Sequence, residues 1–137
     1  EVFDQNIVER FTEVHRQAAS CELYLWRESA KGRLAEIIVL DQFSRNMSRD
    51  SALSFAQDPL ALALAQEAVA MNADQALSPV EKSFLYMPYM HSESLAIHEK
   101  ATVLFESTGI KANIDSEVRH KNIIAEFGRY PHRIRIS

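Results

Sequence analysis

Side chains that carry charge or exchange protons gather in three short stretches of this sequence. The candidate ligand-binding residues in these stretches are Asp41, Gln42, Arg45, Asn46, His91, Glu93, Arg129, His132 and Arg133. Arginine binds carboxylates and phosphates through a planar fork of donors, whereas histidines and carboxylates exchange protons or hold metals. Two kinds of site are therefore open, an anion site and an acid/base or metal site.

The anion site would be built mainly from arginines at the first and third stretches. Its members would be Arg45, Arg49, Arg129, His132 and Arg133. The segment from Gly128 to Pro131 has the composition of a rigid turn, and such a turn can present the flanking cations together. The competing interpretation is that Arg49 and Arg133 are solvated surface residues.

The acid/base or metal site would use Asp41, His91, Glu93, His120 and His132. These are suitable ligand types, but the chain contains no His-Glu-x-x-His motif. The spacing from His91 to Glu93 fits neither one face of a helix nor a zinc signature. A serine nucleophile has less support, because no nucleophile-elbow motif is present.

Structural interpretations compete with both kinds of site. Asp41 and Arg45 lie four residues apart, so on a helix they share a face and can form an ion pair. His120 lies on one helical stripe with Ile124 and Phe127, which is typical of a hydrogen-bonded core histidine.

The first polar stretch follows directly on an apolar run from Leu34 to Leu40. Buried polar side chains must find hydrogen-bond partners, so this junction is the place where we expect a site. Ile37, Ile38 and Val39 are β-branched and would suit a strand. Because no other segment offers that strand a partner, we expect a helix that begins near Arg33.

Helical periodicity and capping signals predict the other elements. The expected helices are residues 4–19, 33–46, 60–71, 79–87, 92–107 and 116–127, with a short helical turn at 52–56. Asp58 and Pro59 form a start signal in which Asp58 caps the free amides. Ser78 and Glu81 form a capping box, and the helix that they open is expected to stop before Pro88.

Gly109 and Gly128 follow the last two predicted helices and are expected to cap them. The short aromatic segment ending at Trp26 is predicted to be a connection between helices, with Trp26 packed onto the neighbouring helix. With no convincing strand, the predicted fold is an all-α bundle of about six helices in a single domain, residues 1–137.

Composition excludes several classes of function. The net charge is −4 and the isoelectric point is near 5.7, which disfavours duplex nucleic acid as the main partner. The three glycines are isolated from one another, so neither a P-loop nor a dinucleotide-binding fingerprint is present. Whether the protein uses a cofactor is left open.

The expected location is the cytoplasm. No apolar run approaches the roughly 20 residues of a membrane span, and the first residues are acidic where a signal peptide is basic. The single cysteine, Cys21, cannot form an internal disulfide and is expected to fill a small apolar space.

Three motifs carry a resemblance to a known family. Residues 40–46 read LDQFSRN, residues 84–93 read FLYMPYMHSE and residues 127–133 read FGRYPHR. Together they resemble a bacterial family catalogued as domain of unknown function 924, from about Arg33 to Arg133. The resemblance implies an all-helical fold similar to tetratricopeptide-like bundles, with no established activity. The chain departs from the family pattern at its start, where a Trp-Phe lead is missing, and at Ile134, where asparagine is usual.

Two hypotheses of function follow. In the first, the protein is a binding or interaction module whose groove holds a small anionic molecule or a peptide terminus through Arg45, Arg129, His132 and Arg133. In the second, it is a hydrolase that uses Asp41, His91 and Glu93, with or without a metal. Both hypotheses require the three motifs to meet in space, because their polar side chains satisfy one another most easily at a shared site. Ligand identity and oligomeric state are left open.

Overall fold

The computed structural model describes residues 2–47, 52–131 and 133, and the parts of the chain that it describes are helical with no strand. The helices are α1 (Val2–Ala19), α2 (Ala30–Ile38), α3 (Ser44–Met47), α4 (Asp58–Ala70), α5 (Pro79–His91), α6 (Leu95–Thr108) and α7 (Lys111–Phe127). Short helical segments connect them: η1 (Tyr24–Glu28), η2 (Val39–Phe43), η3 (Ala52–Phe55) and η4 (Ala73–Ala76). The predicted all-α class is therefore confirmed.

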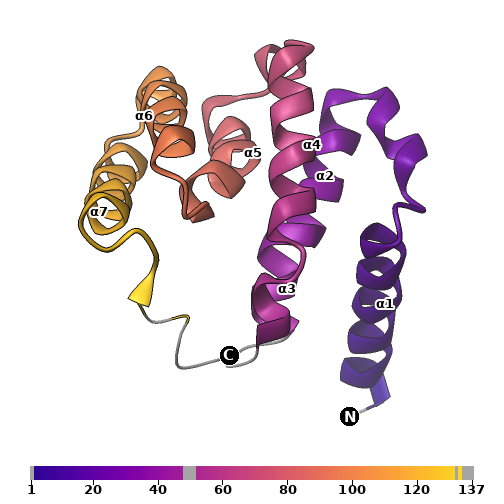
Figure 1. Cartoon of the computed structure of the whole chain (residues 1–137). Coiled ribbons are helices and arrows are strands. Elements are labelled where there is room, and N and C mark those ends of the chain that lie inside the picture. Colours follow the sequence, from indigo (N-terminus) through magenta and orange to yellow (C-terminus); the bar gives the residue numbers. More distant parts are fainter. Residues whose placement is uncertain (1, 48–51, 132, 134–137) are drawn as a thin grey trace.

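Consecutive helices pack on one another from α4 to α7, and α2 packs against both α4 and α5. Figure 1 shows α4 near the middle of the molecule, with α6 and α7 on one side and α1 on the other. After α7 the chain returns toward the start of α4, where Arg133 lies 3.5 Å from Asp58. This return brings the third motif close to the first.

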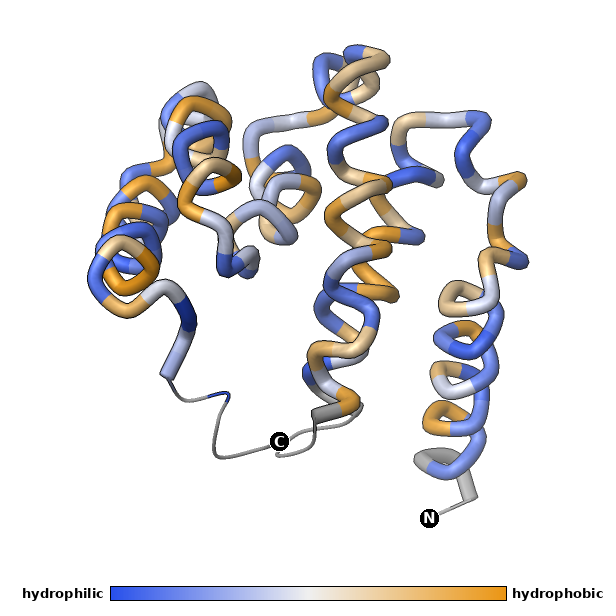
Figure 2. Tube along the Cα trace, viewed as in Figure 1, coloured by the Kyte–Doolittle hydropathy of each residue, from blue (hydrophilic) through white to orange (hydrophobic). Residues whose placement is uncertain are grey.

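The core lies where α2, η2, α4, α5 and α6 meet. Its fully buried apolar side chains include Ile37, Leu40, Ala65, Leu85 and Phe105. Figure 2 shows apolar and polar residues interspersed along the helices. No described helix is long and apolar enough to cross a membrane.

The β-branched run is helical as predicted, but it leads into a π-helical turn, Val39–Phe43. A π turn holds more residues than an α turn, so it changes the direction in which the following side chains point. Asp41 lies inside this turn and is buried. The turn therefore places the Asp41 side chain in the interior.

The predicted end of α5 before Pro88 is wrong, because the helix continues to His91. Proline removes one backbone donor and crowds the preceding turn, which usually ends a helix. Here Tyr89 and Met90 are each 3% exposed, and the burial of both side chains offsets that cost. Consequently His91 occupies the last turn of α5.

Other boundaries and environments also differ from prediction. The last helix begins at Lys111, five residues before the predicted start at Ser116, because Ile114 packs against the core and extends the helix. Cys21 is exposed at a φ of 62° and fills no apolar space. Trp26, which was expected to pack onto the neighbouring helix, keeps 37% of its surface exposed. The predicted caps at Gly109 and Gly128 are confirmed, with φ values of 72° and 73°.

The capping box of α5 gives a direct test of the fold. The Ser78 hydroxyl accepts from Glu81 N at 3.2 Å, and the Glu81 carboxylate accepts from Ser78 N at 2.9 Å. We expect Ser78→Ala to lower the free energy of unfolding by about 1 kcal/mol, measured by denaturant titration. Thr12→Ala, which removes only an exposed bond to Val8 O, should change it by less than about 0.5 kcal/mol. Equal losses in the two variants would contradict the capping role.

Candidate functional site

The centre of the site is the Asp41 carboxylate, which is 1% exposed. Its Oδ1 accepts from Arg45 Nη1 at 2.9 Å and lies 2.7 Å from His91 Nδ1. Its Oδ2 accepts from Gln42 Nε2 at 3.0 Å. The predicted pairing of Asp41 with Arg45 is confirmed, and the first two motifs meet at this carboxylate.

Arg45 extends the cluster to the start of α4. Its Nη1 and Nη2 donate to the two carboxylate oxygens of Asp58, each at 3.0 Å. Asp58 was predicted to cap α4, but Gln57 holds the N-cap position and no side-chain cap bond forms there. The acid is instead engaged by the guanidinium, because a two-pronged ion pair is stronger than a bond to one amide.

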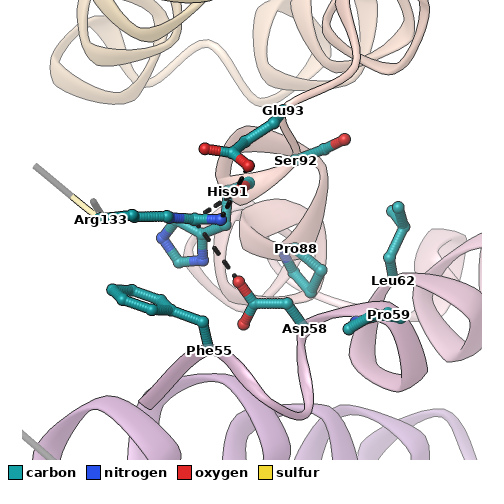
Figure 3. Close-up of a pocket in the computed structure, with 9 residues that line it drawn as sticks. All are labelled: Phe55, Asp58, Pro59, Leu62, Pro88, His91, Ser92, Glu93 and Arg133. Atoms are coloured by element: carbon teal, nitrogen blue, oxygen red, sulfur yellow. Dashed lines mark hydrogen bonds and ion pairs between the residues drawn. The ribbon is translucent and has the colours of Figure 1, made fainter. Parts of the chain in front are cut away.

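Arg133 brings the third motif into the same cluster. Its Nη2 donates to His91 O at 2.8 Å and lies 3.5 Å from Asp58 Oδ2. Its guanidinium also lies over the rings of Phe55 and Tyr130, 4.5 Å and 5.0 Å from their centroids. Figure 3 shows Arg133 reaching between Phe55 and Glu93 toward His91. All three motifs therefore converge, as predicted.

Tyr130 anchors the segment that carries Arg133. Its hydroxyl donates to Met90 O at 2.5 Å and lies 2.9 Å from His98 Nε2, while its backbone N–H donates to Glu93 at 2.7 Å. Burial raises the pKa of the Tyr130 hydroxyl, so it remains a proton donor at all ordinary pH values. Glu93 thus holds the third motif in place and does not pair with His91.

A buried pair behind Tyr130 completes this anchor. His98 Nδ1 lies 2.7 Å from Glu117 Oε2, and His98 Nε2 donates to Ser92 O at 2.6 Å. Both side chains are fully buried. Sequence reasoning missed this network, since His98 and Glu117 lie on different helices and no local spacing relates them.

Two adjoining pockets border the cluster. The first, about 280 Å³, is lined by Phe55, Asp58, Pro59, Leu62, Pro88, His91, Ser92, Glu93 and Arg133. The second, about 220 Å³, is lined by Arg45, Phe55, His91, His120, Tyr130 and Arg133. His91 and Arg133 line both pockets. Of these two pockets, only the first is lined by carboxylates of the described residues, Asp58 and Glu93.

The two pocket histidines have different environments. Asp41 engages His91 Nδ1, and His91 Nε2 has no hydrogen-bond partner among the described residues. His120 Nδ1 donates to Ser116 O at 2.7 Å, which leaves its Nε2 as an acceptor. Burial lowers the pKa of His120, so this ring is neutral near pH 7. His120 is hydrogen-bonded as predicted, but it lines a pocket rather than the core.

The structure does not bring every predicted residue to the cluster. Arg129 is exposed and lines neither pocket. Asn46 lies in α3, and its side chain lies outside the description. Arg49, His132 and Ile134 lie outside the described residues. Within the described ranges, no group of three or more His, Cys, Asp or Glu side chains is arranged to hold a metal ion.

Comparison with known proteins identifies the family. The model of a family of bacterial proteins of unknown function, DUF924, matches residues 1–136. The chain belongs to the DUF924 family. The chain is also similar to a solved structure, the protein of unknown function ATU0120 from Agrobacterium tumefaciens, with 38% sequence identity and a TM-score of 0.90. The match covers 98% of this chain and 76% of that one. None of the curated proteins matches the chain.

The role of Asp41 in this DUF924 chain can be measured as stability. Asp41→Ala would leave Arg45 and His91 without their shared buried acceptor. We expect the free energy of unfolding to fall by about 2–4 kcal/mol in denaturant titrations. The matched control is Glu13→Ala, which breaks an exposed pair with Arg16 and should cost less than about 1 kcal/mol. A loss below about 0.5 kcal/mol for Asp41→Ala would contradict a buried ionic centre.

Proposed function

We propose that the 220 Å³ pocket binds a small anionic group, a phosphate or a carboxylate. The observation that carries the proposal is the charge of the lining: Arg45, Arg133, His91 and His120 face this pocket, and no carboxylate among the described residues does. Cationic hydrogen-bond donors favour an anion in a pocket that no described carboxylate lines, even though acids outside this lining pair with both arginines.

The arginines are held in place before any ligand arrives. The ion pairs of Arg45 with Asp41 and Asp58 fix its guanidinium, while its Nε–H has no partner among the described residues. The Arg133 guanidinium packs over the rings of Phe55 and Tyr130. Donors that are already ordered lose little entropy on binding, so this arrangement supports recognition of a small ligand.

The arrangement of helices supports two further parts of the proposal. Consecutive pairing of α4 to α7 is consistent with tetratricopeptide-like hairpins, so a peptide carboxyl terminus is a suitable occupant as well as a free small molecule. We also place the protein in the cytoplasm, where small phosphorylated and carboxylated molecules are abundant.

Of the arginines predicted to bind the anion, Arg45 and Arg133 carry the proposal and Arg129 does not.

A hydrolase is the second candidate, favoured by the contact of Asp41 with His91. A carboxylate that holds one ring nitrogen leaves the other nitrogen of His91 to exchange protons with a ligand in the pocket. Glu93 plays no part in this version, because it is engaged by Tyr130 N and Arg133. The carboxylate and histidine would act without a metal.

Thermal stability in the presence of anions tests the binding proposal. Inorganic phosphate or malonate should raise the melting temperature of the wild type, since a ligand at about a hundredfold excess over Kd stabilises the folded state by about 2.7 kcal/mol. Arg133→Ala should lose at least half of this shift. Arg129→Ala is the matched control, because Arg129 is exposed and outside the pocket, and it should keep the full shift.

Chloride at equal ionic strength separates specific binding from general salt effects, since phosphate also stabilises proteins by exclusion from their surface. Equal shifts in the wild type and Arg133→Ala would contradict an anion site at Arg133.

A further inference from the structure

The two histidines of the anion pocket are held in ways suited to opposite proton-transfer roles. The Asp41 carboxylate lies 2.7 Å from His91 Nδ1, so a negative charge balances a proton on the outer nitrogen of His91. His120 is held by a backbone carbonyl instead, 2.7 Å from its Nδ1, and keeps a free lone pair on Nε2. Titratable groups whose surroundings differ in this way are candidates for an acid and a base.

Among the described residues, the charged and titratable groups around the pair come from several elements. They are Asp41 and Arg45 from η2 and α3, Asp58 from α4, Glu93 after α5, His98 from α6, Glu117 from α7, and Tyr130 and Arg133 from the returning segment. Asp41 contacts His91 directly, whereas no carboxylate in the described part of the chain is hydrogen-bonded to His120. This difference assigns the acid to His91 and the base to His120.

We propose that the protein hydrolyses a phosphodiester in this pocket, with His120 as the general base and His91 as the general acid. The inference rests on the anion site proposed above. His120 Nε2 takes a proton from water, and the water oxygen forms a bond to phosphorus. The ester P–O bond breaks, and His91 Nε2 gives its proton to the departing oxygen. The products are a phosphomonoester and an alcohol, and solvent returns the proton from His120 to His91.

The charge of the pocket favours a diester over a monoester. Arg45 is already paired with Asp41 and Asp58, and Arg133 lies near Asp58 and Glu93, so the two guanidinium charges are largely balanced. A phosphodiester carries one negative charge, whereas a phosphomonoester carries −1.5 to −2 near neutral pH. Partly balanced arginines suit the singly charged group better. A general base accelerates the attack of water on a diester by removing its proton, and a general acid assists departure of the alcohol by protonating its oxygen.

Hydrolysis of bis-p-nitrophenyl phosphate, followed by the absorbance of released nitrophenolate in buffer containing EDTA, tests the proposal. The wild type should release nitrophenolate with saturation kinetics. His120→Asn should lower kcat by about 10²- to 10⁴-fold, the usual contribution of a general base. His91→Asn should lower kcat less with this substrate, because nitrophenolate is a good leaving group that departs with little help from a general acid. The asparagine amide at position 91 still donates to Asp41. Arg129→Ala should stay within about twofold of wild type, because Arg129 is exposed and does not line the pocket.

The pH profile distinguishes catalysis from structural damage. The wild type should lose activity at low pH as His120 becomes protonated, and His120→Asn should lack this acidic limb. His120 is half-buried and bonded within its own helix, so this variant carries the test even if His91→Asn fails to fold.

The two measurements, phosphate stabilisation and nitrophenolate release, distinguish failure of the catalytic proposal from failure of the anion-site proposal. Stabilisation by phosphate with no nitrophenolate release above that of the His91→Asn, His120→Asn double variant would overturn the catalytic proposal and leave the anion site intact. A full rate in His120→Asn would overturn the catalytic proposal too. Absence of both phosphate stabilisation and hydrolysis would overturn both.

Discussion

The structure depends on one constraint, the burial of the Asp41 carboxylate. An ionised carboxylate removed from water is costly unless it is paired and hydrogen-bonded. Asp41 has 1% of its surface exposed and is engaged by three side chains, Arg45, His91 and Gln42. These partners come from α5 as well as from its own segment, so the carboxylate fixes the end of α5 against the π turn η2. Loss of this acceptor would disturb both elements together.

The remaining contacts continue outward from that centre with alternating charge. Arg45 is held between Asp41 and Asp58, and Asp58 also lies near Arg133, which donates to the backbone of His91. A second network, built on His98, Glu117 and Tyr130, secures the returning segment from the opposite side. The pocket between the two networks is lined by polar groups that are already oriented, which is a requirement for selective binding and for proton transfer.

Local signals in the sequence predicted the parts of the fold that depend on near neighbours. Ser78 with Glu81, Gly109 and Gly128 mark helix ends because capping is decided within a few residues. The four-residue spacing of Asp41 and Arg45 likewise predicted their pairing. Four features were not predicted. They are the continuation of α5 through Pro88, the ion pair of Arg45 with Asp58, the pairing of His98 with Glu117 and the position of His120 in a pocket. Each of these depends on contacts between helices, which a single sequence does not specify.

The central claim is that a proton on His91 Nδ1 is held by the Asp41 carboxylate while Nε2 faces the pocket. Two-dimensional ¹H–¹⁵N correlation of the histidine ring nitrogens measures this directly. We expect His91 Nδ1 to carry a proton with the chemical shift of a strong hydrogen bond near neutral pH, and this signal to move when Asp41 is replaced by asparagine. An unprotonated Nδ1 with the proton only on Nε2, or a spectrum unchanged by Asp41→Asn, would contradict the account.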